Sequence, residues 1–506
     1  MRPFASSFFG SLAMCVALLS PWPTHAATPS QAGDKLRAFL DGVPDLGPGY
    51  AVVVVDRNGH VLDYVRGQRN VRTGAPLTMD TPVYIASQTK AYMGLLAQRL
   101  DRRGVLPLDS TLAEAWPEVK WPAGVDASKW TIADLLHHRV PISADAITKL
   151  EAYIQAPDPA AYPRLIAQFA TARDPGFEYD NLGYNLYAAL LARRTGKRWQ
   201  DWLAEEVFKP LGLQHTSART SDFAGDTLAY SHVWIGGEQG WEVVPPKPDA
   251  IMQSAGGMVT SPDDMARWLQ VQLGAGLPVG FDARLLDAAH RVGAHVDPKA
   301  KNAYELPCSG YAFGWNVCDF RGHRLYIHGG AYTGARTMMA FSPELGVGIG
   351  VFSNSDNMTG WLTSRTVVQY LQFLTDQADA GEWAAERQKQ YPERVAKFLL
   401  DRRTKFEQAR ADAGWSGWNW KPDAAALAMF VGRYRSARPG ISVDVLPTSD
   451  GLLLREGARR QRLAPAAPDL FGATWLSLDV PEPVRFHRDG KGGITGFEYG
   501  GERYVR

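Results

Sequence analysis

The chain has 506 residues and a formal net charge of +1, and 21% of its residues are charged. This balance predicts no basic surface of the kind that binds nucleic acid, so a nucleic-acid partner is not expected. A hydrophobic fraction of 45% with 16 tryptophans predicts well-packed globular domains.

The first 26 residues have the features of a secretory signal peptide. Arg2 precedes a short apolar run from Phe8 to Ser20, and Ala26 or Ala27 offers a small residue at a cleavage site. The run is too short to span a bilayer, and no later apolar stretch approaches ~20 residues, so no transmembrane span is expected. We therefore expect a periplasmic or secreted protein.

Residues 50–66 predict a β-hairpin, because two strand-like runs flank Asn58-Gly59, a favoured two-residue turn. A strand-like run then leads from Val83 into a helical pattern over 89–103, which Gly104 ends. Ser87 and Lys90 lie at this junction.

A three-residue step on a helix places the Ser87 and Lys90 side chains on one face. A serine hydroxyl is a poor nucleophile until a base takes its proton, and burial or a positive neighbour can lower the pKa of a lysine enough to serve. Backbone N–H groups at a helix start suit an oxyanion. Ser-x-x-Lys therefore indicates a nucleophile with its activator.

Two further motifs follow in order. Tyr179-Asp180-Asn181 is the only Tyr-x-Asn of the chain, and His328-Gly329-Gly330 is the only His-x-Gly. Helical patterns occupy 182–195 and 262–273, and strand signals return over 325–328, 337–341 and 347–352. Strands at both ends with helices between them predict an α+β domain, in which one antiparallel sheet is closed by the two ends of the segment and flanked by helices.

Two cysteines, Cys308 and Cys318, remain once the predicted signal peptide is removed. In an exported protein such a pair predicts a disulfide, and Gly310 between them would permit a bridged hairpin. Two buried free thiols are the alternative. Neither cysteine has Cys or His neighbours at zinc spacing, so no metal site is expected.

Residues 381–421 are charged, helical in period and rich in tryptophan at their end. We interpret this segment as a helical linker whose tryptophans, Trp415, Trp418 and Trp420, form an interdomain seam rather than a ligand platform. Beyond it, 422–506 consists of short alternating runs separated by turns, which predict a small antiparallel β domain.

The three motifs, in this order, resemble those of the penicillin-recognising serine hydrolases. The resemblance is nearest to the branch that holds class C β-lactamases, D-alanyl-D-alanine carboxypeptidases, D-aminopeptidases and esterases. It covers roughly 35–375, within a hydrolase domain expected over 35–380, and implies a β-lactamase/transpeptidase-like sheet flanked by helices, with no cofactor. The segment 422–506 resembles the lipocalin-like barrels appended to some members.

The resemblance also implies a role for each motif residue. Ser87 would be the acyl-forming nucleophile. Lys90 and Tyr179 would share the work of the base, in a division that stays open, since a phenol beside a cation can be depressed toward phenolate. Asn181 would hydrogen-bond the substrate amide and help to hold Lys90, and His328 would face the serine from an edge strand.

Two backbone positions complete the implied site. Gly330 would let a substrate backbone approach the strand closely. The N–H groups of Ser87 and Ala331 would form the oxyanion hole.

Two stretches depart from the family pattern. Ser355-Asp356-Asn357 matches the letter of a Ser-Asp-Asn element, but it falls after the third motif and reads as a strand-end turn. Where the family often has His-Thr-Ser-Gly, this chain has His137-His138-Arg139-Val140, which leaves the local backbone open.

We expect an exported hydrolase that cleaves an amide or ester of a small-molecule or peptide substrate, as a D-amino-acid peptidase or an esterase. Histidine is charged only below a pKa of about 6.5, so His328 makes strong β-lactam hydrolysis less expected, although a β-lactamase is an alternative. A neutral His328 that only donates a hydrogen bond fits equally well. A penicillin- or cell-wall-peptide-binding protein with little turnover is an alternative of another class. The natural substrate and the oligomeric state stay open.

Overall fold

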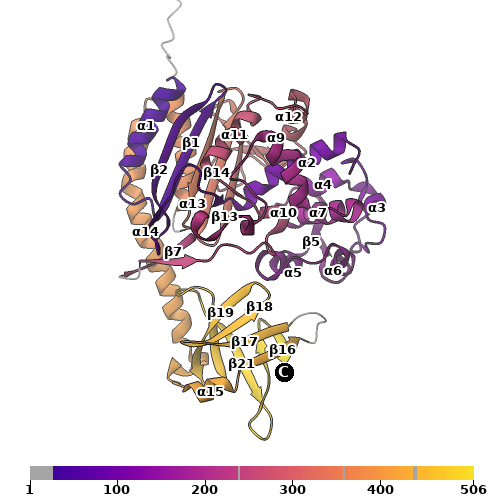
Figure 1. Cartoon of the computed structure of the whole chain (residues 1–506), viewed down its shortest axis with the longest axis vertical. Coiled ribbons are helices and arrows are strands. Elements are labelled where there is room, and N and C mark those ends of the chain that lie inside the picture. Colours follow the sequence, from indigo (N-terminus) through magenta and orange to yellow (C-terminus); the bar gives the residue numbers. More distant parts are fainter. Residues whose placement is uncertain (1–26, 238–239, 357–358, 437–441) are drawn as a thin grey trace, which may run out of the picture.

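The computed structural model describes residues 27–237, 240–356, 359–436 and 442–506, so the predicted signal peptide lies outside the described residues. The chain forms a large domain built on one sheet and a small barrel, and the long helix α14 (Ala380–Ala411) runs beside the sheet and on to the barrel (Figure 1). These two bodies agree with the predicted fold class.

A nine-stranded antiparallel sheet organises the large domain, in the order β10-β11-β12-β13-β14-β15-β1-β2-β3. The strand β15 pairs with β1, so the two ends of the domain meet in the middle of the sheet, as the sequence predicts. The strands are β1 (Gly49–Asp56), β2 (His60–Asn70), β3 (Ala75–Pro76), β10 (Ala294–His295), β11 (Cys308–Tyr311), β12 (Asn316–Phe320), β13 (His323–Tyr332), β14 (Ala335–Ser342) and β15 (Val347–Ser353).

Both faces of the sheet are covered, because β1 is apolar at nearly every position and alternate residues point to opposite faces. Val53 and Val55 belong to the core shared with α2 (Thr89–Arg102) and α11 (Pro262–Gln272). Val52 and Val54 belong to the core on the other side, which α1 (Pro29–Asp41), α13 (Thr359–Leu374) and the start of α14 complete. Ser87 and Lys90 lie on the α2 side.

A mostly helical region packs beside α2 and carries the second motif. The predicted helices agree closely with α2, with α7 (Leu182–Thr195) and with α11. The remaining helices are α3 (Leu112–Ala115), α4 (Ile132–Leu136), α5 (Asp145–Lys149), α6 (Tyr162–Phe169), α8 (Trp199–Leu203), α9 (Lys209–Leu211), α10 (Gln253–Gly256) and α12 (Ala283–His290). Short strand pairs join β4 (Val83–Tyr84) to β9 (Val259–Thr260), β5 (Ile142–Ser143) to β6 (Thr171–Ala172), and β7 (Ser231–Gly236) to β8 (Gly240–Val244).

The C-terminal body is a closed antiparallel barrel, preceded by α15 (Ala424–Ala428). Its strands are β16 (Gly432–Ser436), β17 (Ser442–Thr448), β18 (Gly451–Glu456), β19 (Arg459–Ala467), β20 (Leu470–Thr474), β21 (Glu482–Arg488), β22 (Ile494–Tyr499) and β23 (Glu502–Val505). Trp415 and Trp418 stack between the end of α14 and the outside of the barrel, with ring centroids 4.7 Å apart, while Trp420 packs against the barrel core. Trp415 and Trp418 thus pack the end of α14 against the barrel, and the seam between the two domains stays a prediction.

Within the described ranges, none of the helices is both long and apolar enough to cross a bilayer.

Candidate active site

Ser87 lies in the short 3-10 helix η1 (Ala86–Gln88), where the strand β4 turns into α2. Ala86, the residue before it, has φ of 46°, a left-handed conformation that is strained for a residue with a Cβ. The turn is held from two sides, because the Thr89 hydroxyl donates to the Ala86 carbonyl over 2.7 Å and accepts from the Met258 backbone N–H over 3.1 Å. These contacts fix the backbone that presents the Ser87 hydroxyl.

Lys90 lies in the first turn of α2 and is fully buried. Its Nζ donates to Asn181 Oδ1 and to the Ala255 carbonyl, each over 2.8 Å, and it reaches Ser87 Oγ over 3.4 Å. Burial lowers the pKa of Lys90 from 10.5 to about 7, against a smaller opposing effect of Asp180. A large fraction of Lys90 is therefore neutral near pH 7. The longest of the three hydrogen bonds of its Nζ is the one to Ser87 Oγ.

Tyr179 stands above the Lys90 ammonium, whose Nζ lies 4.8 Å from the centre of the ring. The residue is 43% exposed. Desolvation of the hydroxyl raises the pKa of Tyr179 above 10.0, and the interaction with the Ser87 side chain offsets only part of this effect. The exposure limits the size of the shift but not its direction. The expected depression of this phenol toward phenolate is therefore wrong, because desolvation raises the pKa of Tyr179, and the hydroxyl holds its proton at neutral pH.

The loop before α7 is anchored by a buried histidine that sequence reasoning left open. His138 has φ of 56°, and its Nδ1 accepts a hydrogen bond from the Asp180 backbone N–H over 3.3 Å. The His138 ring lies 4.7 Å from that of Tyr179. The departure from the family pattern at His138 therefore supports the Tyr179–Asn181 loop from beneath, and it keeps Asn181 in contact with Lys90.

His328 lies on β13, which the family resemblance implied to be an edge strand. The strand is internal, with β12 on one side and β14 on the other, so that expectation is wrong for the sheet as a whole. However, the pairing with β12 ends at Ile327, whereas the pairing with β14 continues to Tyr332. The segment from His328 to Tyr332 thus has a free edge, that is, one side not paired with another strand of the described chain, because β13 extends past the end of β12.

The His328 ring is buried and neutral. Its Nδ1 donates to the Gly329 carbonyl over 2.8 Å, which leaves Nε2 to accept the Tyr311 hydroxyl over 3.4 Å. Burial, together with the nearby charge of Lys90, lowers the pKa of His328 to about 3. Of the two roles left open for this residue, the geometry favours the neutral imidazole over an imidazolium that would meet a carboxylate.

Gly330 and Ala331 follow along the free edge. A Cβ on Gly330 would lie 2.1 Å from the Ile85 carbonyl, so a glycine is needed for β13 to approach the segment that carries Ser87. The Gly329 N–H donates to the Tyr304 hydroxyl over 3.3 Å, away from β14. Because residues two apart on a strand share an edge, the Ala331 N–H points to the same open side. The roles of Gly330 toward substrate and of Ala331 in an oxyanion hole stay predictions.

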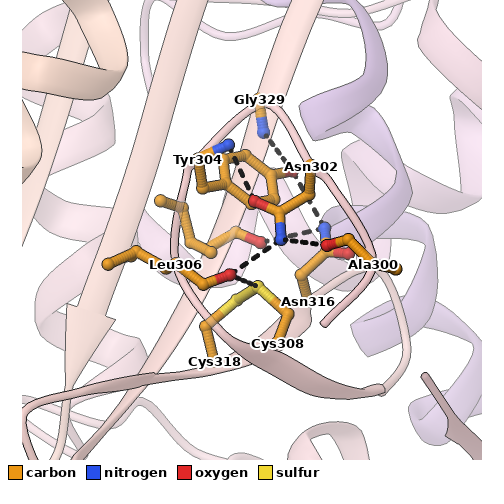
Figure 2. The surroundings of a disulfide bond; sticks show 9 residues. Ala300, Asn302, Tyr304, Leu306, Cys308, Asn316, Cys318 and Gly329 are labelled. Carbon is orange, nitrogen blue, oxygen red and sulfur yellow. Dashed lines mark hydrogen bonds between the residues drawn. A yellow bond between two sulfur atoms is a disulfide. The ribbon is translucent and has the colours of Figure 1, made fainter. Parts of the chain in front are cut away.

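Cys308 and Cys318 form a disulfide between neighbouring strands β11 and β12, at positions paired in register (Figure 2). The chain leading into it is braced by Asn302, which donates to the Leu306 carbonyl over 2.7 Å. Figure 2 shows how this loop brings Tyr304 against the sheet, where its hydroxyl also accepts from Asn316 over 2.9 Å. The disulfide thus ties Cys308, where the loop that carries Tyr304 ends, to the neighbouring strand β12.

These residues border one cavity of about 910 Å³, in which the structure brings together Ser87, Tyr179, His328, Gly330 and Ala331. Lys90 and Asn181 lie beneath it. The polar residues on its wall that sequence reasoning missed include Tyr304, Asn316 and Arg336. The place of Arg336 at the site could have been predicted from the sequence, because a hairpin formed by β13 and β14 pairs it with Ala331.

Within the part of the chain that the structure describes, His, Cys, Asp and Glu side chains form no group of three or more that could hold a metal ion. Asp356, from the Ser-Asp-Asn sequence after β15, accepts the Gly334 backbone N–H over 3.0 Å and does not border the cavity. Asn357 lies outside the described residues.

The family model described as Beta-lactamase matches residues 39–369. Among curated proteins, the chain is 25% identical to "Unguisins hydrolase ungD'" of Aspergillus campestris over 69% of this chain and 67% of that protein. It is 27% identical to "Penicillin-binding protein 4" of Amycolatopsis lactamdurans over 62% of this chain and 83% of that protein.

Solved structures share the fold. A penicillin-binding protein homologue from Pyrococcus abyssi, described as octameric, aligns with a TM-score of 0.57 at 20% identity, over 94% of this chain and 99% of that one. A D-amino acid amidase from Ochrobactrum anthropi aligns with a TM-score of 0.54 at 21% identity, over 69% and 98%. The hydrolase EstCE1, described as having promiscuous acyltransferase activity, aligns with a TM-score of 0.56 at 18% identity, over 69% and 98%.

Proposed function

The chain belongs to the β-lactamase family, and we propose that it is a serine hydrolase that forms an acyl-enzyme on Ser87 and cleaves an amide or ester. The observation that carries the proposal is the contact of Lys90 with Ser87, because burial gives this lysine a pKa of about 7 beside a hydroxyl that needs a base.

The proposed reaction assigns separate work to the two candidate bases. Neutral Lys90 takes the proton of Ser87 as its oxygen attacks the substrate carbonyl carbon. The resulting oxyanion lies toward the N–H groups of Ser87 and Ala331. Tyr179, which keeps its proton, gives it to the leaving group as the carbonyl–leaving-group bond breaks, and it regains a proton from Lys90. A water molecule then hydrolyses the ester to Ser87 and releases a carboxylic acid.

The substrate class we propose is an amide, peptide or ester of a D-amino acid. A relative by fold, the D-amino acid amidase, supports the amide class by analogy alone. Neutral His328 offers no positive charge to a β-lactam carboxylate, which makes strong β-lactamase activity the weaker candidate. The wall of the cavity still carries two cationic side chains, Arg336 and Lys301, for a substrate with a free carboxylate.

We also propose that the protein is exported. The signal-peptide features of residues 1–26 support this, and so does the Cys308–Cys318 disulfide, since disulfides persist in oxidising compartments.

Purified protein should be assayed against D-amino-acid amides, D-alanyl-D-alanine peptides, short-chain p-nitrophenyl esters and a chromogenic cephalosporin. We expect turnover of an amide or ester, its loss in Ser87→Ala, and its retention in Ser128→Ala, which removes an exposed serine hydroxyl elsewhere. Full turnover by Ser87→Ala would refute the nucleophile. One equivalent of acylation without turnover would instead favour the penicillin- or peptide-binding protein.

A further inference from the structure

A second cavity, of about 230 Å³, lies between the large domain and the barrel. The large domain contributes Tyr84, Tyr153 and Tyr332 to its wall, and the barrel contributes Arg460 and Trp475. The two bodies are joined beside it, since the Ala458 backbone N–H of the barrel donates to the Ile154 carbonyl over 2.8 Å. The cavity is separate from the one that holds Ser87.

Aromatic rings form much of this wall. The rings of Tyr153 and Tyr332 stack with centroids 6.0 Å apart, and Tyr84 meets Tyr332 edge-on at 5.5 Å. From the barrel, Trp475 lies edge-on to Tyr153 at 6.5 Å. Such walls suit a small ligand with a flat or apolar body.

The charged residues of the wall are all cationic. Lys247, Arg459 and Arg460 border the cavity, and none of its described lining residues is Asp or Glu. Arg459 is paired with Glu482 over 3.2 Å, whereas Arg460 is exposed. An anion is therefore the ligand that this wall favours.

Lys247 is the most telling of these residues, because it is only 7% exposed. Its Nζ donates to the carbonyls of Pro248 and Ile251 over 3.0 and 3.1 Å, and within the described residues no carboxylate oxygen lies within ion-pair distance of it. Asp249 is the acid that influences Lys247 electrostatically, but its carboxylate accepts hydrogen bonds from Thr220 and Ser221. A buried ammonium held only by neutral groups is costly, and an anionic ligand would offset this cost.

We propose that this interdomain cavity binds an organic carboxylate with a small aromatic or apolar body. The carboxylate meets the Lys247 ammonium and the Arg460 guanidinium, and the body lies against Tyr153, Tyr332 and Trp475. This site goes beyond the proposed hydrolysis, because none of its groups takes part in acylation of Ser87. It does adjoin the hydrolytic site along the chain, since Tyr84 is three residues before Ser87 and Tyr332 follows Ala331.

The test is a calorimetric titration of the full chain with 3-phenylpropionate and with its neutral amide, 3-phenylpropanamide. The Ser87→Ala variant is used throughout, so that the outcome does not depend on the proposed hydrolysis. We expect the carboxylate to bind at least about ten-fold more tightly than the amide, because a hydrogen bond to a charged group is involved.

Variants separate the parts of the site. Lys247→Met and Arg460→Gln should each weaken binding of the carboxylate about ten-fold or more, while Lys405→Met, which removes an exposed lysine of α14, should leave it unchanged. Because Arg460 is exposed, the Arg460→Gln variant should fold, and it tests the proposed carboxylate site even if Lys247→Met fails to fold. Trp475→Ala should weaken both probes.

Three outcomes would overturn the proposal. They are equal affinity for acid and amide, unchanged affinity in folded Lys247→Met or in Arg460→Gln, and no binding of either probe at millimolar concentration. Inorganic phosphate binding as tightly as 3-phenylpropionate, with no effect of Trp475→Ala, would show a simple anion site and overturn the aromatic part.

Discussion

Replacement of Asn181 by aspartate tests whether the buried Lys90 is the base. Asn181 Oδ1 accepts from Lys90 Nζ over 2.8 Å, so Asn181→Asp places a carboxylate at the same position with almost no change in volume. In the wild type, a pKa of about 7 leaves about half of Lys90 neutral at pH 7, whereas the ordinary 10.5 would leave only about 0.03% neutral. The catalytic benefit of burial is therefore a large gain in the basic form.

An adjacent negative charge favours the ammonium and should raise the pKa of Lys90 to roughly 8–10. At pH 7 this lowers the neutral fraction, and with it kcat/KM, by roughly 5- to 500-fold. The loss should recover as pH rises, because the base form returns above the new pKa. A p-nitrophenyl ester is the right substrate, since its leaving group needs no proton and the rising limb reports Lys90 alone.

The wild type should show a rising limb of kcat/KM with a midpoint near pH 7, and Asn181→Asp should move that midpoint upward. Asn58→Asp adds the same charge in the exposed β1–β2 turn and should leave the midpoint in place. An equal loss at every pH, with an unmoved midpoint, would refute the assignment of Lys90 as the base and reduce Asn181 to a substrate contact.

Three further results are expected. Tyr179→Phe should lower kcat/KM for an amide about 10²-fold or more, and that for a p-nitrophenyl ester much less, because only the amide leaving group needs a proton; equal losses would contradict the acid role. Because the pKa of His328 is about 3, its ring stays neutral above that pH. Carboxylate-bearing and neutral substrates should therefore share one pH profile of kcat/KM between about pH 5 and 9. A falling limb seen only with carboxylate-bearing substrates would show an imidazolium. Replacing both Cys308 and Cys318 by alanine removes a disulfide between residues 10 apart, which should lower the free energy of unfolding by about 2–3 kcal/mol in a urea titration. It should also raise KM, because Cys308 ends the loop that carries Tyr304. An unchanged KM would argue that the disulfide does not hold this loop in place.

Local pattern was sufficient for much of the fold. The helix after Ser87 and the helix after Asn181 follow from periodicity, the hairpin over 50–66 follows from its two strand-like runs, and the structure has them as α2, α7 and β1–β2. The connection in the hairpin is the three-residue loop 57–59 rather than the predicted two-residue turn. The apolar strand predicted over 347–352 is β15, which pairs with β1, and both strands are apolar on their two faces. The small antiparallel β domain likewise follows from short alternating runs separated by turns, whereas its closure into a barrel was implied by the family resemblance alone.

The features that sequence reasoning missed depend on where strands end in space and on desolvation. The free edge at His328 arises because β12 stops one residue earlier, which no spacing within β13 reveals. The pKa of Tyr179 is raised by desolvation, which depends on segments far apart in the chain. Arg336 and Tyr304 reach the cavity through pairing and a loop, so neither belongs to a motif.

Covalent labelling tests the central claim most directly. A fluorophosphonate should add one adduct to the protein, and peptide mapping by mass spectrometry should place it on Ser87, because this is the serine that Lys90 contacts. Labelling should be lost in Ser87→Ala and kept in Ser128→Ala. An adduct on another residue, or undiminished labelling of Ser87→Ala, would contradict the acyl-enzyme account.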